Sequence, residues 1–387
     1  MKFATKNKNI IVAGYIVCGP IGGLVWHHLQ YLVGLQQLGH DVLFVEDSHD
    51  YPACYHPTTF QLTKDPSYGL DFLQTVFEQY GLKDRWAYFD YHTNCWFGKT
   101  KEDVKRFVDK ADIYINLSGV DPLREHFQKI PIRVFVDTDP AFTQIRHLTE
   151  KSALQVALKH NRFFSFGENF ERADCLIPDD GFEWLPTRQP VVLNLWQHNT
   201  MVNGTAKWTT VMQWDSYKVR EFEGRKFGMK SFSFDTYVHL PKRINEKIEL
   251  ALGSTTAPRE KLMAEGWQIT DPLPVSLTPQ TYQAYILQSK GEWSVAKHGY
   301  VYSNSGWFSE RSCAYLASGK PVIIQETGFS KFLPTGNGLF SFTTVEEAID
   351  ALQMVNKNYK QHCKEARNMA EEYFDSKKVL SSLMERL

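Results

Sequence analysis

Short apolar runs alternate along the chain with longer stretches in which apolar residues recur at helical spacing. Residues 10–15 form a nearly continuous apolar run, which is typical of a strand buried on both faces of a parallel sheet. A loop at residues 18–23 leads into a helical stretch that reaches residue 38, and Gly39 can end that helix in a left-handed cap. Residues 42–45 then predict a second strand. This order is a complete βαβ unit, which requires a parallel sheet covered by helices.

The same alternation continues through the first half of the chain. Apolar runs at residues 113–115, 134–136 and 163–166 predict further strands, so we expect an open α/β sheet of about five or six strands there. Residues 178–190 then gather Pro, Asp and Gly, which interrupt any regular element. This stretch therefore predicts a linker between two domains.

A second series of apolar runs follows the predicted linker. It predicts strands at residues 191–193, 210–212, 248–252, 267–269, 293–295 and 321–324. After a last apolar run, two amphipathic stretches predict C-terminal helices. We therefore expect two open α/β sheets that face each other across a cleft, with ligands bound outside the carboxyl ends of their strands. The predicted domains are 1–185 and 186–360, followed by a helical segment, 361–387, that can pack back on the first domain.

Composition narrows the partners that the protein can have. The 387 residues carry 43 Lys and Arg against 44 Asp and Glu, a net charge of -1, and no charged tail. We therefore expect no nucleic-acid binding driven by phosphate neutralisation. No apolar run approaches the ~18 residues that a membrane-spanning helix needs. The cysteines are scattered without a CxxC pair, which favours a reduced, cytoplasmic protein without structural zinc.

The most informative stretch, residues 303–324, combines a small polar loop, a helix, a Gly-Lys-Pro corner and a buried strand. Ser309 is a favourable N-cap, and small residues at the helix start leave hydrogen-bond donors free. A diphosphate is stabilised there by the helix dipole and unpaired amides, and an arginine can add a planar cation. The alternative is an ordinary capped helix with solvated charges. The diphosphate-binding candidates of this stretch are Ser305, Gly306, Ser309 and Arg311.

Several segments resemble the GT-B fold of glycosyltransferases. Residues 312–324 are similar to the donor-binding helix and following strand of that superfamily, and residues 325–339 resemble the loop and glycine-rich tail after them. Gly22 and Gly23, with His27, resemble the first glycine loop of its N-terminal domain. The resemblance implies an α/β protein of two Rossmann-like domains facing a cleft, followed by C-terminal helices. The nucleotide-sugar donor would bind the second domain and the acceptor the first.

The resemblance also implies an activity, the transfer of a sugar from a UDP- or dTDP-linked donor to an acceptor hydroxyl, with no cofactor and no required metal. Ala314 stands where many members place a glutamate that holds the donor ribose, and the nearest carboxylate, Glu310, lies one turn earlier. The paired-glutamate signature of the retaining families is absent, so neither retention nor inversion is assigned. A sugar-nucleotide epimerase of the same fold and a non-catalytic nucleotide-sugar-binding protein are the alternatives.

Further donor-site candidates follow from the same resemblance. They lie at predicted strand ends and loops of the second half, and in the first glycine loop, where the backbone can approach a phosphate closely. For Lys297 and His298 the alternatives are a solvated surface charge and a loop histidine. The additional diphosphate candidates are Gly22, Gly23 and Lys297, the nucleotide candidates are Trp267, Asp271 and Glu310, and the sugar candidates are His298, Gln325, Thr327 and Gly328.

Two residues of the first half are candidates for acid–base catalysis. His27 follows the glycine loop, and because a histidine titrates near neutral pH it can take a proton from an acceptor hydroxyl. The alternative is a packed histidine. Asp139 follows a predicted strand in the sequence Asp137-Thr138-Asp139, a spacing that can hold a divalent ion. We favour acid–base work or acceptor contact by Asp139 without a metal, against the alternative of helix N-capping.

Residues 51–100 are rich in aromatic side chains. Some of these are spaced for a helix and predict core packing. Trp86, Tyr88, Tyr91 and Trp96 can instead line an acceptor pocket, because aromatic faces stack on sugars and other flat ligands. A locally packed insertion explains them equally well.

Overall fold

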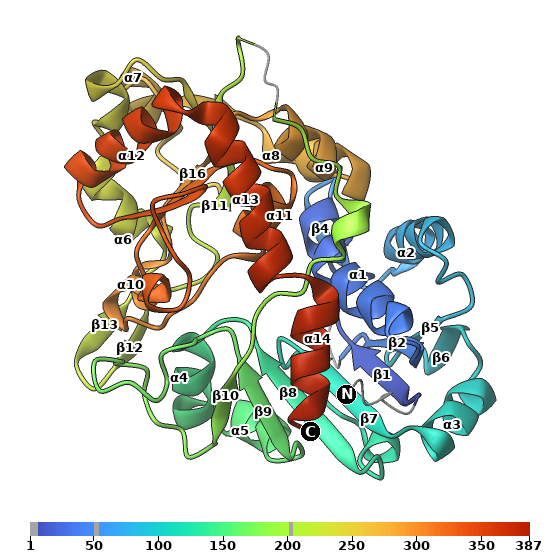
Figure 1. Cartoon of the computed structure of the whole chain (residues 1–387). Helices are drawn as coiled ribbons and strands as arrows, with labels where there is room; N and C mark the ends of the chain where they lie inside the picture. The colour runs from blue at the N-terminus through green and yellow to red at the C-terminus, as the bar shows by residue number, and fades with distance from the viewer. Residues whose placement is uncertain (1–6, 50–53, 201–203) are drawn as a thin grey trace, which may run out of the picture.

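The computed structural model describes residues 7–49, 54–200 and 204–387, which fold around two parallel sheets (Figure 1). The first sheet has the strand order β10-β9-β8-β7-β1-β2-β5-β6, and β6 joins β5 in antiparallel orientation at one edge. Its strands are β1 (Asn9–Ala13), β2 (Asp41–Asp47), β5 (Trp86–Asp90), β6 (Cys95–Gly98), β7 (Ile113–Leu117), β8 (Ile132–Asp137), β9 (Arg162–Ser165) and β10 (Trp184–Pro186).

The predicted βαβ unit is confirmed at the start of the chain. Strand β1 pairs in parallel with β2, and the helix between them ends at Gly39, whose φ of 91° is left-handed. A small hairpin, β3 (Cys54–His56) with β4 (Gln61–Thr63), lies outside the sheet. The helices of this half are α1 (Gly22–Gln37), α2 (Ser67–Gln79), α3 (Lys101–Lys110), α4 (Phe142–Thr149) and α5 (Lys151–Ala157).

The second sheet is parallel throughout and has the order β15-β14-β11-β16-β17-β18. Its strands are β11 (Trp208–Gln213), β14 (Ile248–Gly253), β15 (Gln268–Thr270), β16 (Gly291–Ser294), β17 (Val322–Gln325) and β18 (Leu339–Phe342), and a hairpin of β12 (Arg220–Phe222) and β13 (Arg225–Phe227) extends from it. The helices are α6 (Lys230–Phe234), α7 (Arg259–Ala264), α8 (Pro272–Ser276), α9 (Pro279–Gln288), α10 (His298–Tyr302), α11 (Glu310–Ala317), α12 (Val345–Lys357), α13 (Tyr359–Tyr373) and α14 (Ser376–Glu385).

The first sheet is larger than the expected five or six strands, because β5, β6 and part of the predicted linker also pair with it. Strand β10 lies within residues 178–190 and joins β9 in parallel. Pro186 is tolerated there because an edge strand needs hydrogen bonds on one side only. Residues 191–193, predicted as a strand, belong to neither sheet, since Val191 forms only an isolated bridge to Asp375. Their apolar character reflects burial beside α1, where the Val192 amide donates to Gln30 at 2.6 Å.

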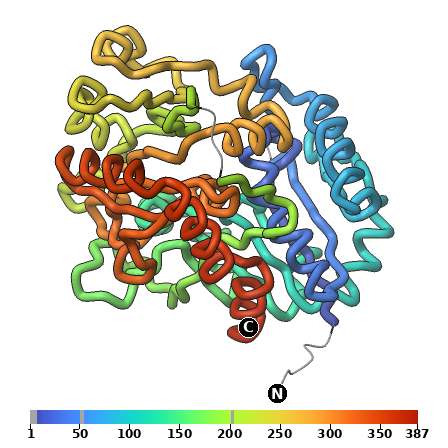
Figure 2. Tube along the Cα trace, turned by 45° about the horizontal axis from the view of Figure 1, so that its top comes forward, coloured from blue at the N-terminus to red at the C-terminus, as the bar shows by residue number. Residues whose placement is uncertain are grey.

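The C-terminal helices return to the first half of the molecule. Figures 1 and 2 show α13 and α14, in red, running from the second sheet to the side of α1. Strand-like hydrogen bonds fasten the bend between them, because the Val191 amide donates to Phe374 and the Ser376 amide donates to Val191. Gly34 of α1 lies so close to α14 that an added Cβ would be 2.6 Å from Leu380. In the described part of the chain, none of the helices meets the length and apolarity that crossing a membrane requires.

One apolar cluster is continuous across both halves. It contains Leu29 and Leu32 of α1, Tyr315 of α11 and Leu380 of α14. The start of α1 also meets the start of α9, where the Trp26 indole donates to the Pro279 carbonyl at 3.0 Å. These contacts set the distance between the two sheets and therefore the width of the space between them.

We expect Gly22→Ala to destabilise this junction. A Cβ at position 22 would lie 2.2 Å from the Thr278 carbonyl oxygen, a backbone atom that cannot turn aside. Relief requires a shift of α1 against α9, so the free energy of unfolding should fall by roughly 1–3 kcal/mol. Thermal unfolding measures the change. Gly204→Ala is the control, because nothing lies within 4 Å of its added Cβ, and equal melting temperatures for the two variants would contradict the prediction.

Candidate functional site

A cavity of about 640 Å³ lies between the two sheets, at the carboxyl ends of their strands. The first half contributes the residues after β1 and β8 and the first turns of α1. The second half contributes the end of β11, the starts of α6 and α8, and the segments before α10 and α11. Of the predicted site residues, those that line the cavity are Gly23, His27, Asp139, Lys297, Ser309, Glu310 and Arg311.

Asp139 is the centre of a polar cluster that bridges the two halves. It follows β8, and its Oδ1 lies 2.8 Å from Nζ of Lys297, which follows β16. The hydroxyls of Tyr217 and Tyr300, also from the second half, donate to the same carboxylate. The Lys297 ammonium stands over the rings of Phe142, Tyr217 and Tyr300 as well, at 4.5–5.2 Å. The predicted phosphate ligand Lys297 is therefore bound to Asp139 in this structure.

This cluster makes Asp139 a poor proton acceptor. Burial alone would raise the pKa of Asp139, but the charge of Lys297 and the hydrogen bonds from Lys297, Tyr217 and Tyr300 outweigh it and lower the pKa. Asp137 faces other partners, because the hydroxyls of Thr143 and Ser165 donate to it. The two carboxylates of the Asp-x-Asp sequence therefore do not converge on one ion.

His27 lies on α1 with 7% of its surface exposed. Burial lowers the pKa of His27 to about 4, so the imidazole is neutral at pH 7. Its Nδ1 is 3.4 Å from a carboxylate oxygen of Glu310 across the cavity. No described residue forms a hydrogen bond with its Nε2, which is enclosed by protein. Of the two nitrogens, Nδ1 is therefore the one directed at the opposite half.

The start of α11 is only partly open. The Ser309 hydroxyl accepts from the Arg311 amide at 3.2 Å, as expected of an N-cap. The Arg311 guanidinium is held by the buried Glu292 at 2.5 Å and donates to the Val211 carbonyl and the Ser294 hydroxyl. Three of its five N–H groups are thus held by the second sheet, and the side chain also lines the cavity.

Lys230 is a cavity residue that sequence reasoning missed. Only 8% of its surface is exposed, and within the described ranges no residue forms a hydrogen bond or ion pair with its ammonium group. Burial, and then the nearby Arg311 charge, lower the pKa of Lys230 well below its usual value. Residues 220–230 are rich in charges and resemble a solvated hairpin, so only the fold distinguishes this lysine from its exposed neighbours.

Four predicted ligand residues instead hold the two halves together around Asn169. The Asn169 amide donates to Ser305 at 3.2 Å, and the Gly306 amide donates to Thr327 at 2.7 Å. An added Cβ at Gly328 would lie 2.1 Å from Nδ2 of Asn169. The small polar residues that resemble a phosphate loop are here required for close packing between domains, and none of them lines the cavity.

Gly22 and the remaining nucleotide and sugar candidates also lie outside the cavity. Trp267 is 2% exposed and donates its indole N–H to Val238 at 2.8 Å, so its ring belongs to the core and offers no face to a base. Asp271 caps α8 by accepting from Leu273. His298 accepts from the Gly228 amide, and Gln325 accepts from the Ala296 amide. Each of these side chains has a structural partner that its sequence position did not reveal.

The aromatic stretch divides into core and surface. Trp86 and Tyr88 are buried in the first half, whereas Tyr91 and Trp96 are not. None of the four lines the cavity. Tyr55 and Phe60, from the β3–β4 hairpin, line the cavity instead. Tyr51 lies outside the described residues.

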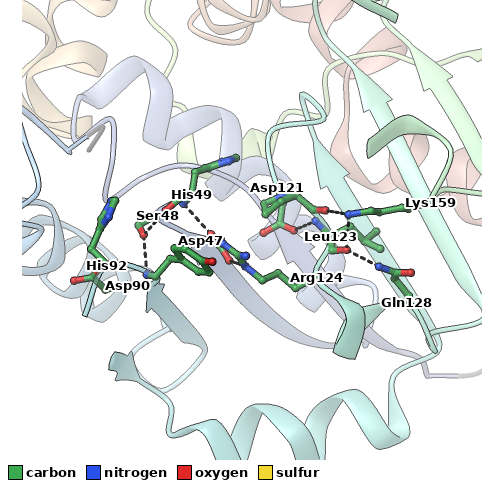
Figure 3. Close-up of polar contacts among 12 residues, drawn as sticks. Asp47, Ser48, His49, Asp90, His92, Asp121, Leu123, Arg124, Gln128 and Lys159 are labelled. Carbon is green, nitrogen blue, oxygen red and sulfur yellow. Dashed lines mark hydrogen bonds and ion pairs between the residues drawn. The ribbon is translucent and has the colours of Figure 1, made fainter. Parts of the chain in front are cut away.

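A second polar cluster occupies the ends of β2, β5 and β7 (Figure 3). Asp47 is paired with Arg124 at 2.6 Å and 2.9 Å, and Asp121 accepts from the Leu123 amide. Lys159 donates to the Pro122 carbonyl. In the part of the chain that the structure describes, no group of His, Cys, Asp and Glu is arranged to hold a metal ion. Most of its polar groups are paired with one another, but the buried Nε2 of His92 forms no hydrogen bond with a described residue.

Comparison with known proteins identifies the fold. No protein-family model and no curated protein matches the sequence. Among solved structures, an alpha-glucosyltransferase in complex with UDP-glucose and DNA containing an abasic site aligns with a TM-score of 0.57 at 10% identity, over 99% of each chain. HepE of Anabaena, in complex with UDP and glucose, aligns at 0.56 and 10%, over 98% of this chain and 99% of HepE. Sucrose-phosphate synthase of Thermosynechococcus elongatus aligns at 0.54 and 12%, over 97% of each chain. The chain therefore has the GT-B fold, as its sequence indicated.

Replacing Asp139 tests the polar cluster that bridges the halves. Asp139→Asn leaves the Lys297 ammonium without a counter-charge, so we expect a loss of roughly 3 kcal/mol of unfolding free energy at pH 7. Because the pKa of Asp139 is lowered on folding, its contribution is present above the unfolded pKa of about 3.9. It is lost as the pH falls through the lower folded value.

Melting temperatures of wild type and Asp139→Asn should therefore differ most near neutral pH and converge toward pH ~3. Asp174→Asn is the control, because its ion pair with Lys331 is largely solvated and should contribute little. A difference in melting temperature between wild type and Asp139→Asn that does not change with pH would contradict the assignment.

Proposed function

We propose that the protein is a glycosyltransferase that transfers a sugar from a nucleotide-diphosphate sugar to a hydroxyl of an acceptor. The observation that carries this proposal is the unpaired Lys230 ammonium in the wall of the cavity. Burial without a partner disfavours the charged form of a lysine, and an anionic ligand would stabilise that form. Strongly perturbed ionisable groups in a cavity are typical of functional sites.

The fold supports the same assignment. Solved proteins of this fold have been obtained with UDP, with UDP-glucose, and with UDP and glucose. By analogy we place the nucleotide sugar against the second half and the acceptor against the first. UDP is the carrier that we favour over dTDP. The arrangement of cavity residues from both halves fits a reaction in which two substrates meet between the sheets.

Each cavity group has a defined part in this proposal. Lys230, the free N–H groups of Arg311 and the start of α11 would stabilise the nucleoside diphosphate as it leaves with the electron pair of the sugar–oxygen bond. The neutral His27 is the group that we propose to accept the proton of the acceptor hydroxyl as that oxygen bonds to the sugar, although its lowered pKa of about 4 makes it a weak base in the unliganded protein. Enclosure between the halves would exclude water and limit donor hydrolysis. Since these cations can meet the diphosphate charge, we expect no metal and no further cofactor to be required.

A screen of nucleoside diphosphates tests the proposal directly. UDP and its sugars should raise the melting temperature, because a ligand that binds only the folded state stabilises it. With the correct donor, UDP should be released slowly even without acceptor, by hydrolysis. Binding without any release of UDP would favour the non-catalytic nucleotide-sugar-binding alternative, and no shift with any nucleoside diphosphate would reject the proposal.

We expect Lys230→Met to weaken UDP binding without lowering the stability of the fold. UDP affinity should fall about 10- to 100-fold, because a charge-assisted contact to phosphate is lost. The melting temperature of the unliganded protein should stay constant or rise, because the variant no longer buries an unpaired charge. Titration calorimetry and thermal unfolding measure the two effects.

Lys290→Met is the matched control. Lys290 is also partly buried, but it is paired with Glu246 and does not line the cavity. Its replacement should lower stability and leave UDP affinity unchanged. Unchanged UDP affinity in Lys230→Met would remove Lys230 from the site.

A further inference from the structure

The charges around the cavity are unevenly paired. Asp139 neutralises Lys297, and Glu292 neutralises Arg311. Two ionisable groups remain, Lys230 and Glu310, and these two do not form an ion pair with each other. The cavity as a whole therefore carries no excess positive charge with which to attract a diphosphate.

Glu310 lies where a bound diphosphate would be most favoured. It is the first residue of α11, and its side chain, 41% exposed, borders the cavity. The amides at this helix start and the helix dipole attract a phosphate, but they attract the glutamate carboxylate in the same way. A diphosphate and an ionised Glu310 would therefore compete for one positive region and repel each other.

The neighbours of Glu310 determine its charge. His27 of α1, at 3.4 Å, is neutral at pH 7, and Tyr31 of the same helix and Tyr300 of α10 are uncharged there. Asp139, after β8, is a like charge, whereas Arg311 and Lys297 are positive but already paired. Burial lowers the pKa of Lys230, which attracts Glu310 only in its protonated form. Burial raises the pKa of Glu310, and the attraction of Arg311 and Lys297 only partly offsets that effect.

We propose that this cavity binds a diphosphate together with a proton, which Glu310 takes up. The inference rests on the proposed function, because it concerns the same cavity and the same ligand class. A carboxylate only accepts hydrogen bonds, whereas a protonated carboxyl group can donate one to a phosphate oxygen. Protonation thus converts Glu310 from a repelling group into a ligand and leaves Lys230 as the net positive charge of the site.

Two other groups of the cavity, His27 and Lys230, also have lowered pKa values and can take up a proton when an anion binds. His27 is in contact with Glu310, and a nearby diphosphate would also favour its charged form. The sites are distinguishable by substitution, because Glu310→Gln, His27→Asn and Lys230→Met each remove one titratable group, and the first two keep a polar side chain of similar size. Since the Glu310 side chain is partly exposed in the cavity, its replacement by Gln should leave the fold intact.

Calorimetric titration with UDP at pH 8 in buffers of different ionisation enthalpy measures the protons taken up on binding. At this pH the terminal phosphate of free UDP, with a pKa of about 6, is already deprotonated. We expect wild type and His27→Asn to take up a fraction of a proton and Glu310→Gln to take up markedly less. In wild type the affinity should fall as the pH rises from 7 to 9, by up to tenfold per unit, whereas in Glu310→Gln it should stay nearly flat.

The outcomes separate the two proposals. Proton uptake that is equal in wild type and Glu310→Gln, or that disappears in His27→Asn or Lys230→Met instead, overturns the role of Glu310 and leaves the glycosyltransferase proposal standing. The pH dependence of the UDP affinity can be measured on the wild type alone. A wild-type affinity that does not change from pH 7 to 9 also overturns the role of Glu310 and leaves the glycosyltransferase proposal standing. Failure of UDP and of every other nucleoside diphosphate to bind wild type rejects the proposed function and this inference with it.

Discussion

The burial of α1 on nearly all of its sides is the constraint on which the rest of the structure depends. One side packs on the first sheet, and the others meet α9 of the second half and the returning α14. A helix enclosed in this way cannot slide without opening apolar surface on several partners at once. The same helix carries His27 and Gly23 to the cavity, so the contacts that join the two halves also set the geometry of the site.

Some ionisable groups of the cavity are held in ion pairs, and others are left without one. The ion pairs of Asp139 with Lys297 and of Glu292 with Arg311 satisfy groups that would otherwise be buried alone. Lys230 and Glu310 are left without such partners, at a place where unpaired charge lowers stability. Unpaired ionisable groups are expected where a protein binds a ligand, because a site whose polar groups are all paired internally has none left to bind the ligand.

The predicted phosphate loop illustrates how one sequence pattern serves two purposes. Small residues with freely accessible amides suit a phosphate, but they equally suit the close approach of two backbones. At Gly306 of this loop, and at the predicted sugar-binding Gly328, the second use is realised, because Asn169 of the first half fills the space beside them. The pattern alone does not distinguish the two, since the partner comes from a segment more than a hundred residues away.

The sequence by itself determined the α/β class, the two parallel sheets and the cleft between them, because apolar period and turn residues are local properties of the chain. It also located His27, Asp139, Ser309, Glu310 and Arg311, which follow strands or begin helices that face the cleft. Only the tertiary structure decided how each of these groups is used. Residues distant in sequence pair Asp139 with a cation, hold Trp267 in the core, and bury Lys230 without giving it a partner. The charge and basicity of a side chain depend on such neighbours, and the order of residues along the chain does not specify them.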